Sequence, residues 1–251
     1  MSDEKQRTPD AAEQAFLESY DPTQFEHPSL AVDLAILTVR DGELLVALVR
    51  RDEHPDKGTW ALPGGFVGMN EGLNAAAARV LETKAGQRSV FLEQLYTFGE
   101  PGRDPRTYVV SVAYYALVNA AKLEELDARG VLLGRLRVPW KGESGGRVDV
   151  LDESGRTLVT AFDHADIIAM SVKRIRGKLD YAPIGFQLLP PTFTLRALQN
   201  VHEAILGTVI NKDSFRRRML ASGQLKATGK HESAVGHRPA ELYRFTRRSA
   251  V

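Results

Sequence analysis

The stretch WALPGGFVGMNEGLNAAAARVLETKAG, from Trp60 to Gly86, decides the fold. After a Leu-Pro-Gly-Gly turn it places five residues at fixed offsets, namely Gly65, Glu71, Arg79, Leu81 and Gly86. Residues three and four positions apart are neighbours on a helix, so positions 80, 83 and 84 would share one helix face. In this chain that face carries Val80, Thr83 and Lys84.

The spacing resembles the signature of the Nudix hydrolases. The resemblance implies an α/β Nudix-like domain, with a mixed sheet flanked by helices. It also implies that Glu71 and Arg79 form a structural pair that holds the loop against the helix. In the Nudix pattern, however, the positions of Val80, Thr83 and Lys84 are glutamates, which offer carboxylates to Mg²⁺ bound between substrate phosphates.

These three departures predict that the chain has no metal site and is not an enzyme. Mg²⁺ prefers oxygen ligands, and valine offers none, threonine only a neutral hydroxyl, and lysine a positive charge. Glu82 points to roughly the opposite face of the helix. The alternative is an enzyme that takes replacement acids from elsewhere, such as Glu100 or Asp104.

The composition is that of an ordinary globular protein, with 251 residues, 26% of them charged and no cysteine. Disulfides and thiolate metal sites are therefore excluded. A polar N-terminus and the lack of long apolar stretches predict a cytoplasmic protein without membrane contact. Charge is uneven: residues 191–251 hold eleven basic and four acidic side chains, whereas the remainder holds 22 basic and 28 acidic ones. The basic region suggests a polyanion partner.

Three strands surround the signature. Leu30–Val39 and Glu43–Arg51 flank an Asp-Gly turn, which predicts a hairpin, and Arg106–Val118 is rich in β-branched and aromatic residues. Before the third strand, YTFGEPGRDPR resembles ADP-ribose-handling Nudix proteins. Guanidinium groups in this loop could grip a pyrophosphate. The expected effector-binding residues are Arg50, Arg103, Arg106, Gly64 and Gly65. Tyr96 or Phe98 could stack on a base, although core positions are favoured for both.

The segment after residue 160 begins with a predicted helix, with Asp163 as its N-cap. TFTLRALQNVHEAILG and INKDSFRRRMLASG, with Thr194 and Asn211 as caps, then read as two helices joined by a tight turn. A strand, a glycine-rich loop with its tip at 236–240, and a second strand follow as a wing. The sequence thus predicts a winged helix-turn-helix, for which the alternative is a helical hairpin used for dimerisation. The expected DNA-binding residues are Lys212, Ser214, Arg216, Arg217, Arg218, Lys226, Lys230 and Arg238, with His237 beside the last.

Taken together, the two halves resemble the Nudix-related transcriptional regulators (NrtR family) of bacterial NAD metabolism. The matching stretches include WALPGGFV, FGEPGRDPR, AFDHADII, FTLRALQNVHEAILG and RPAELYRF; the segment 122–160 fits the family poorly. We expect a polar tail over residues 1–24, an effector-sensing Nudix-like domain over 25–160 and the winged helix-turn-helix over 161–251.

The resemblance implies a homodimeric repressor that binds a palindromic double-stranded DNA operator and controls NAD synthesis or salvage genes. It further implies that the Nudix domain senses ADP-ribose or a related nucleotide, and that no cofactor is required. Two alternatives stay open: an ADP-ribose pyrophosphatase with an accessory basic domain, and a ligand-free Nudix scaffold that serves only dimerisation.

Overall fold

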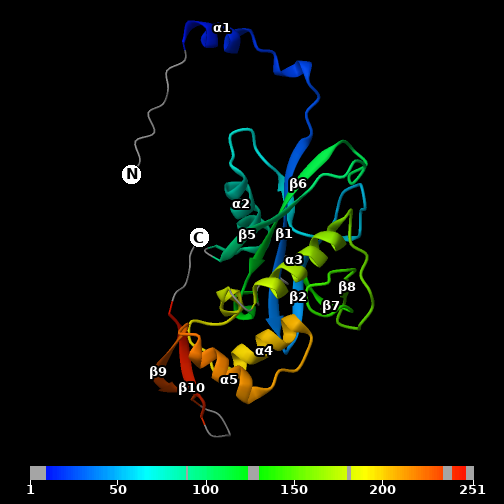
Figure 1. The fold of residues 1–251 in the computed structure, drawn as a ribbon. Coiled ribbons are helices and arrows are strands. Elements are labelled where there is room, and N and C mark those ends of the chain that lie inside the picture. Colours follow the sequence, from blue (N-terminus) through cyan, green and yellow to red (C-terminus); the bar gives the residue numbers. More distant parts are fainter. Residues whose placement is uncertain (1–9, 89, 124–129, 180–181, 234–238, 247–251) are drawn as a thin grey trace.

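The computed structural model describes residues 10–88, 90–123, 130–179, 182–233 and 239–246. An arm that carries α1 stands away from a central sheet, and a small helical and β unit lies at the opposite end (Figure 1). All residues of the arm from Asp10 to His27 are exposed. None of the helices in the described ranges is both long enough and apolar enough to cross a bilayer.

The elements of the first part of the chain are α1 (Ala11–Ser19), β1 (Ser29–Arg40), β2 (Glu43–Arg50), β3 (Trp60–Ala61), β4 (Gly64–Phe66), α2 (Leu73–Ala85), β5 (Phe91–Phe98), β6 (Val109–Leu117), β7 (Val131–Arg137) and β8 (Asp149–Leu151). Short 3₁₀ turns cover Pro22–Gln24 and Ala120–Leu123. The elements that follow are α3 (His164–Lys178), a 3₁₀ segment (Pro183–Leu188), α4 (Leu195–Leu206), α5 (Lys212–Ala221), β9 (Leu225–His231) and β10 (Glu241–Phe245).

The central sheet is mixed, as the resemblance to Nudix proteins implies. Its strand order is β5-β6-β1-β2-β7-β8, with β3 paired to β2 and β4 paired to β1. β1 and β6 run parallel, whereas the other pairs are antiparallel. The predicted hairpin turn is present: Asp41 and Gly42 have φ values of 53° and 78°. Such positive φ values match the right-handed twist of the flanking strands.

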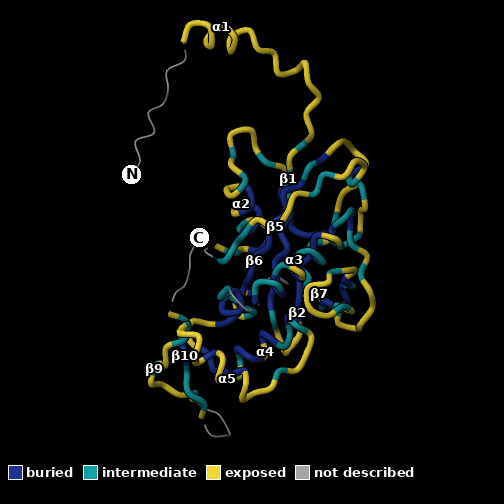
Figure 2. The backbone as a smooth tube through the Cα atoms, in the orientation of Figure 1, coloured by how far each residue is buried: buried dark blue, intermediate teal, exposed yellow. Residues whose placement is uncertain are grey.

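The sheet is buried on both faces because alternate residues of its central strands point to opposite sides. Val32, Leu34 and Ile36 of β1 face one cluster, which includes Ala76, Ala77 and Val80 of α2 and other apolar residues. Ala35 and Leu37 face a second and larger cluster. Buried residues follow the sheet and the inner sides of the helices, whereas the arm and the loops are exposed (Figure 2).

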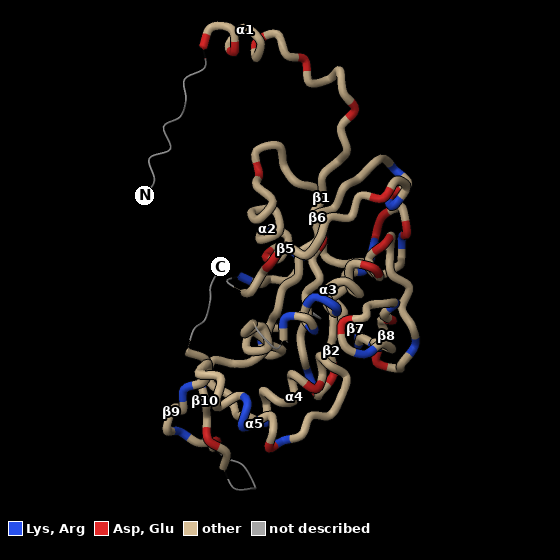
Figure 3. The backbone as a smooth tube through the Cα atoms, viewed as in Figure 1, with Lys and Arg blue, Asp and Glu red and all other residues tan. Residues whose placement is uncertain are grey.

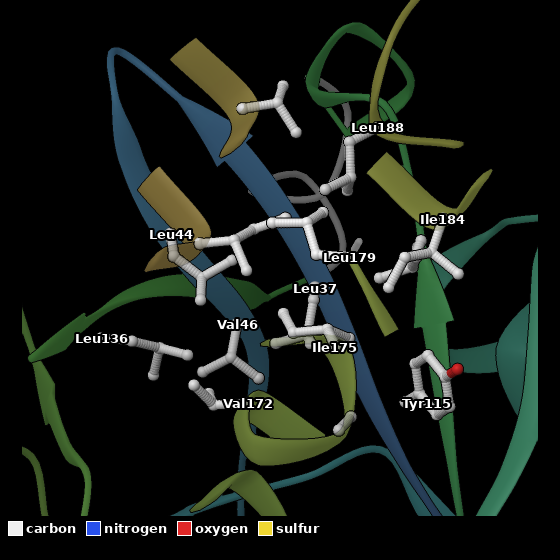
Figure 4. Close-up of a cluster of buried hydrophobic side chains, with 14 of the residues drawn as sticks. Leu37, Leu44, Val46, Tyr115, Leu136, Val172, Ile175, Leu179, Ile184 and Leu188 are labelled. Atoms are coloured by element: carbon white, nitrogen blue, oxygen red, sulfur yellow. The ribbon is translucent and has the colours of Figure 1, made fainter. Parts of the chain in front are cut away.

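Helix α3 covers the second face of the sheet. Figure 4 shows Val172 and Ile175 of α3 beside Leu37, Val46 and Tyr115 of the strands. These residues share one core with Leu198, Val201 and Ile205 of α4. Helix α3, which is predicted to begin the second domain, therefore also packs against the sheet of the first domain. The domain boundary at residue 161 stays a prediction.

The C-terminal part has the predicted helix-turn-helix and wing. Thr194 accepts a hydrogen bond from the Ala197 amide, and Asn211 accepts one from the Ser214 amide, so each caps its helix. Gly207 ends α4 with φ at 67°, in the left-handed region that glycine adopts most readily. β9 and β10 form the antiparallel wing. The predicted wing residues His237 and Arg238 lie outside the described residues.

Candidate functional site

A cavity of about 600 Å³ opens beside β1, β2 and β4, at the loop before β6 and the start of α3. Every residue predicted to bind an effector lines it: Arg50, Arg103, Arg106, Gly64 and Gly65. Thr83 and Lys84, from the end of α2, also line it. Residues as far apart in the sequence as Ala31 and His164 thus meet at one site.

The floor of the cavity is a buried polar cluster around Asp33. Its carboxylate accepts a 2.5 Å hydrogen bond from Ser111, and His164 Nε2 lies 3.6 Å away. His164 Nδ1 accepts a bond from the Leu62 amide at 2.8 Å, so the neutral ring carries its proton on Nε2. Burial lowers the pKa of His164 and favours this neutral form.

Gly64 is required next to this cluster. A Cβ at that position would lie 2.1 Å from Asp33 Oδ1 and 3.0 Å from the Val32 carbonyl oxygen. Only glycine allows β4 to approach β1 so closely at this point. Gly64 is therefore needed for the packing of β4 against β1, and its role in effector binding stays a prediction.

Arg103 lies in the cavity wall, but internal carboxylates hold it. Its guanidinium donates two hydrogen bonds to Asp163, at 2.7 and 2.5 Å, and its side chain is only 6% exposed. Burial lowers the pKa of Arg103, yet its hydrogen bonds to Asp163 and the negative charges of Asp163 and Asp33 outweigh this effect and raise the pKa. Asp163 occupies the N-cap position of α3 but makes no capping bond, because Arg103 binds its carboxylate. The predicted capping role is therefore wrong.

Arg106 is half exposed and more available. It pairs with Asp104 at 3.0 and 2.7 Å, and the bonds from Arg106 lower the pKa of Asp104. The guanidinium lies 5.7 Å from the ring centre of Phe66 and 5.9 Å from that of Phe162. The considered replacement acid Asp104 is thus an ion-pair partner, and Glu100 does not line the cavity.

The sequence does not predict several of the cavity residues, among them Phe162 and Arg51. Phe162 has a positive φ of 50° and donates its amide proton to Asp56. The Arg51 guanidinium lies 4.7 Å from the centre of its ring, within range of a cation–π interaction. These partners come from different loops, and no local pattern relates them.

Tyr96 and Phe98 lie elsewhere and do not line the cavity. Phe98 is half-buried and packs against the main core, which agrees with the core position predicted for it. Tyr96, for which a core position is also predicted, is 56% exposed. A register shift between Gln94 and Tyr96 changes the pairing of β5, which buries Leu95 and turns Tyr96 outward. The core assignment of Tyr96 is therefore wrong.

The predicted pair of Glu71 and Arg79 is present. Arg79 donates to both carboxylate oxygens of Glu71, at 2.6 and 2.7 Å, and to the Phe66 carbonyl oxygen at 3.0 Å. The hydrogen bonds from Arg79, together with that from the Gly68 amide, lower the pKa of Glu71 to about 2. The pair joins the loop before α2 to the helix itself.

The three former glutamate positions do not fit a divalent cation. Val80 is buried and lies beside Gly65, and the Thr83 hydroxyl donates to the Arg79 carbonyl oxygen at 2.8 Å. Lys84 brings an ammonium group to the cavity. In the ranges that the structure describes, no group of three or more His, Asp or Glu side chains could hold a metal ion.

The second candidate site is the outer side of α5 and the wing. Phe215 and Met219 are buried, whereas the predicted contact residues Lys212, Ser214, Arg216, Arg217 and Arg218 are exposed. Lys226 and Lys230 are exposed on β9. Figure 3 shows basic residues on α5 and on β9 at this end of the molecule. Arg216 also interacts with the Tyr243 hydroxyl of β10, which ties the helix to the wing.

The fold and the two sites define a class of protein in which a Nudix-type domain is joined to a winged helix-turn-helix. A model of the NUDIX domain matches residues 27–141, and one of the NrtR DNA-binding winged helix domain matches residues 185–245. An Acinetobacter baylyi protein described as an ADPR responsive transcriptional repressor, NtrR, is 38% identical over 94% of this chain and 89% of its own.

Solved structures agree with this assignment. Shewanella oneidensis NrtR in complex with a 27mer DNA is 34% identical, with a TM-score of 0.72 over 86% of this chain and 93% of the other. A MutT/nudix family protein from Enterococcus faecalis is 28% identical, with a TM-score of 0.75 over 94% of both chains. The chain belongs to the NrtR family of Nudix-related transcriptional regulators.

Proposed function

We propose that this protein is a transcriptional repressor whose Nudix domain binds ADP-ribose or a related nucleotide and thereby changes its affinity for DNA. The observation that carries the proposal is the position of α3. The first residue of α3, His164, lines the cavity, and the helix ends beside α4 of the DNA-binding unit. A ligand in the cavity that moves or stiffens α3 would therefore also affect the DNA-binding unit.

Contacts at the far end of α3 support this coupling. Arg176 donates to the Ile205 carbonyl oxygen of α4 and to the Trp140 carbonyl oxygen, both at 2.7 Å, and its guanidinium lies 4.5 Å from the centre of the Trp140 ring. Burial lowers the pKa of Arg176. At about 1.5 Å per residue, the 15 residues of α3 span roughly 22 Å between the two sites.

The chemistry of the cavity and the similarity to the Acinetobacter protein indicate which effector to test first. Arginine forks match phosphate geometry, and the aromatic rings of Phe66 and Phe162 offer apolar faces to a base. The Acinetobacter protein is described as responsive to ADPR. ADP-ribose is accordingly the first ligand to test, with Arg50, Arg103, Arg106, Gly64 and Gly65 as the residues that surround it.

Repression would require two copies of the chain on a near-palindromic operator. One recognition helix covers only a few base pairs, which is too little for specificity in a genome. Two helices related by a two-fold axis would reach half-sites about one helical turn apart, roughly 34 Å. By family resemblance, the regulated genes belong to NAD synthesis or salvage.

The proposal includes the absence of hydrolase activity. Val80, Thr83 and Lys84 cannot supply the carboxylates that position a metal ion for phosphate chemistry. The alternative, an ADP-ribose pyrophosphatase, requires AMP to form from ADP-ribose when Mg²⁺ is added. Robust turnover of this kind by the native chain would decide for the enzyme.

The test of the sensor uses the whole chain and a DNA fragment selected from a random library. Fluorescence anisotropy measures its affinity with and without ADP-ribose, and sedimentation measures the stoichiometry. We expect two chains per fragment and a clear shift in affinity on addition of ADP-ribose. If ADP-ribose binds but the DNA affinity is unchanged, the cavity does not control the operator.

A further inference from the structure

Lys84 occupies a position where the family signature has a glutamate, and it faces the same cavity as the predicted effector residues. A glutamate at this position serves a divalent cation, and the cation in turn neutralises phosphate. The residues present here cannot hold such an ion, as the buried Val80 and the internally bonded Thr83 hydroxyl show. Lys84 itself places a positive charge at the position where the glutamate would hold a cation.

The charges around the cavity favour an anionic ligand. Five Lys or Arg side chains and four Asp or Glu side chains line it. Asp163 and Asp104 hold two of the cations, Arg103 and Arg106. Across the part of the chain that the structure describes, Lys84 forms neither a hydrogen bond nor an ion pair. Its ammonium group is therefore available to a ligand without the loss of an internal contact.

We propose that Lys84 takes the place of the divalent cation, so that a nucleotide carrying a diphosphate binds this cavity without Mg²⁺. Lysine suits this role because its ammonium is a compact point charge on a flexible stem. The proposal rests on the proposed function of the cavity as a nucleotide site. It adds that Lys84 binds the diphosphate of the ligand and not its nucleoside.

A purely structural role for Lys84 makes different predictions. A lysine in the last turn of a helix is stabilised by the partial negative charge of the helix end. In that case its loss would lower the stability of α2 and leave ligand affinity unchanged. Arg88 offers a matched control, because it follows the same helix, is exposed and does not line the cavity.

The experiment is isothermal calorimetry of ADP-ribose binding to the full chain, in EDTA and in MgCl₂. Native protein should bind equally well in both buffers. Lys84→Gln should weaken ADP-ribose binding about tenfold, which corresponds to 1.4 kcal/mol, whereas Arg88→Gln should leave it unchanged. Binding of adenosine, measured by competition, should be the same for native protein and Lys84→Gln. Thermal unfolding of each variant checks that it is folded.

A charge reversal gives the second arm of the test. Lys84→Glu should lose ADP-ribose affinity in EDTA and recover part of it in MgCl₂. Native binding that requires Mg²⁺, or equal affinities for native protein and Lys84→Gln, would overturn the role of Lys84 and leave the sensor intact. If Lys84→Gln loses adenosine binding as much as it loses ADP-ribose binding, then Lys84 does not act on the diphosphate. If the native chain binds no ADP-ribose in either buffer, the proposed function fails, and this inference fails with it.

Discussion

Arg103 and Arg106 come from one loop but differ in how they could serve a ligand. Arg103 is buried, and its Nε and Nη2 donate to the two carboxylate oxygens of Asp163, so exchanging this carboxylate for a phosphate would cost free energy. Arg106 is 47% exposed, and its single carboxylate partner is two residues away. Asp104 itself is buried, with only 5% of its side chain exposed, so Arg106 should keep its bonds to this carboxylate when a ligand binds. The exposed part of the Arg106 guanidinium is what a ligand can reach.

Arg106→Ala should weaken ADP-ribose binding by about tenfold or more, because a hydrogen bond to a charged group contributes ~1.5–3 kcal/mol. Operator affinity in the absence of nucleotide should stay within twofold, since Arg106 lies far from α5 in the sequence and in the fold. Calorimetry and anisotropy measure the two affinities. Arg156→Ala is the control, as Arg156 is an exposed arginine paired with Asp152 outside the cavity. Unchanged nucleotide affinity in Arg106→Ala would remove this residue from the site.

Glu71 gives a pH-dependent prediction. Its pKa in the folded protein is about 2, below the value of roughly 4.3 that a glutamate has in an unfolded chain. A depressed pKa means that ionised Glu71 stabilises the fold above pH ~4.3 and that this contribution is lost as the pH falls toward 2. Urea unfolding should therefore find native protein more stable than Glu71→Gln by a constant amount between pH 5 and 7. The difference should shrink steadily below pH 4, and a constant difference down to pH 2.5 would contradict it.

Helix α3 depends on contacts that lie far apart in the sequence. Arg103 fixes its first turn from a loop 60 residues upstream, and Arg176 connects its last turn to α4. Between them, its apolar side packs on the sheet (Figure 4). The helix therefore belongs structurally to both the sensing and the DNA-binding parts.

Asp163→Ala should lower the free energy of unfolding by about 2–3 kcal/mol, because it leaves the buried Arg103 guanidinium without its main carboxylate. Asp33, 3.7 Å away, would compensate in part. The matched control is Asp166→Ala, in the same helix turn but exposed. It should cost no more than ~1 kcal/mol, the usual effect of an acid near a helix N-terminus. Chemical denaturation of both variants measures the difference, and equal losses would argue against a special role for the Arg103–Asp163 pair.

Local signals were enough to predict most of the elements. The Asp-Gly turn, the caps Thr194 and Asn211 and the stop at Gly207 each act within a few residues, so the sequence shows them directly. Asp163 has the same local pattern as a cap, yet a distant arginine takes its side chain. Phe162 and Arg51 were missed for the same reason, since only the folded chain brings them together.

At the scale of the whole molecule, charge separates the two sites. The basic residues of α5 and β9 lie at one end (Figure 3). The cavity between β1, β2 and α3 instead combines cations with several carboxylates. DNA phosphates would be drawn to the first surface by a sum of exposed charges. The cavity instead needs individual groups in fixed positions. Mutations on α5 and β9 should therefore change the affinity for DNA and its dependence on salt. Mutations in the cavity should change the affinity for the nucleotide, with a weaker dependence on salt.

The exposed arginines of α5 should carry operator specificity. If Arg216 or Arg217 binds a guanine bidentately, its replacement by alanine should cost ~1–3 kcal/mol and relax the sequence preference at one position. Arg217 is the sharper test, because Arg216 also interacts with Tyr243. Lys226→Ala on the wing should instead weaken binding to all sequences alike and reduce the slope of log affinity against log salt by about one. The same phosphate or minor-groove role is predicted for Arg238.

The measurement is an anisotropy titration of Arg216→Ala, Arg217→Ala, Lys226→Ala and Arg238→Ala on operator and on scrambled DNA, at several salt concentrations. Arg156→Ala removes an equal charge from the Nudix domain and should change neither affinity nor slope, since Arg156 lies in the loop after β8. A loss confined to operator DNA assigns a side chain to base recognition, whereas a uniform loss assigns it to the phosphates. If all four variants bind operator as the native protein does, α5 is not the recognition helix. The DNA surface must then lie on another face of the molecule.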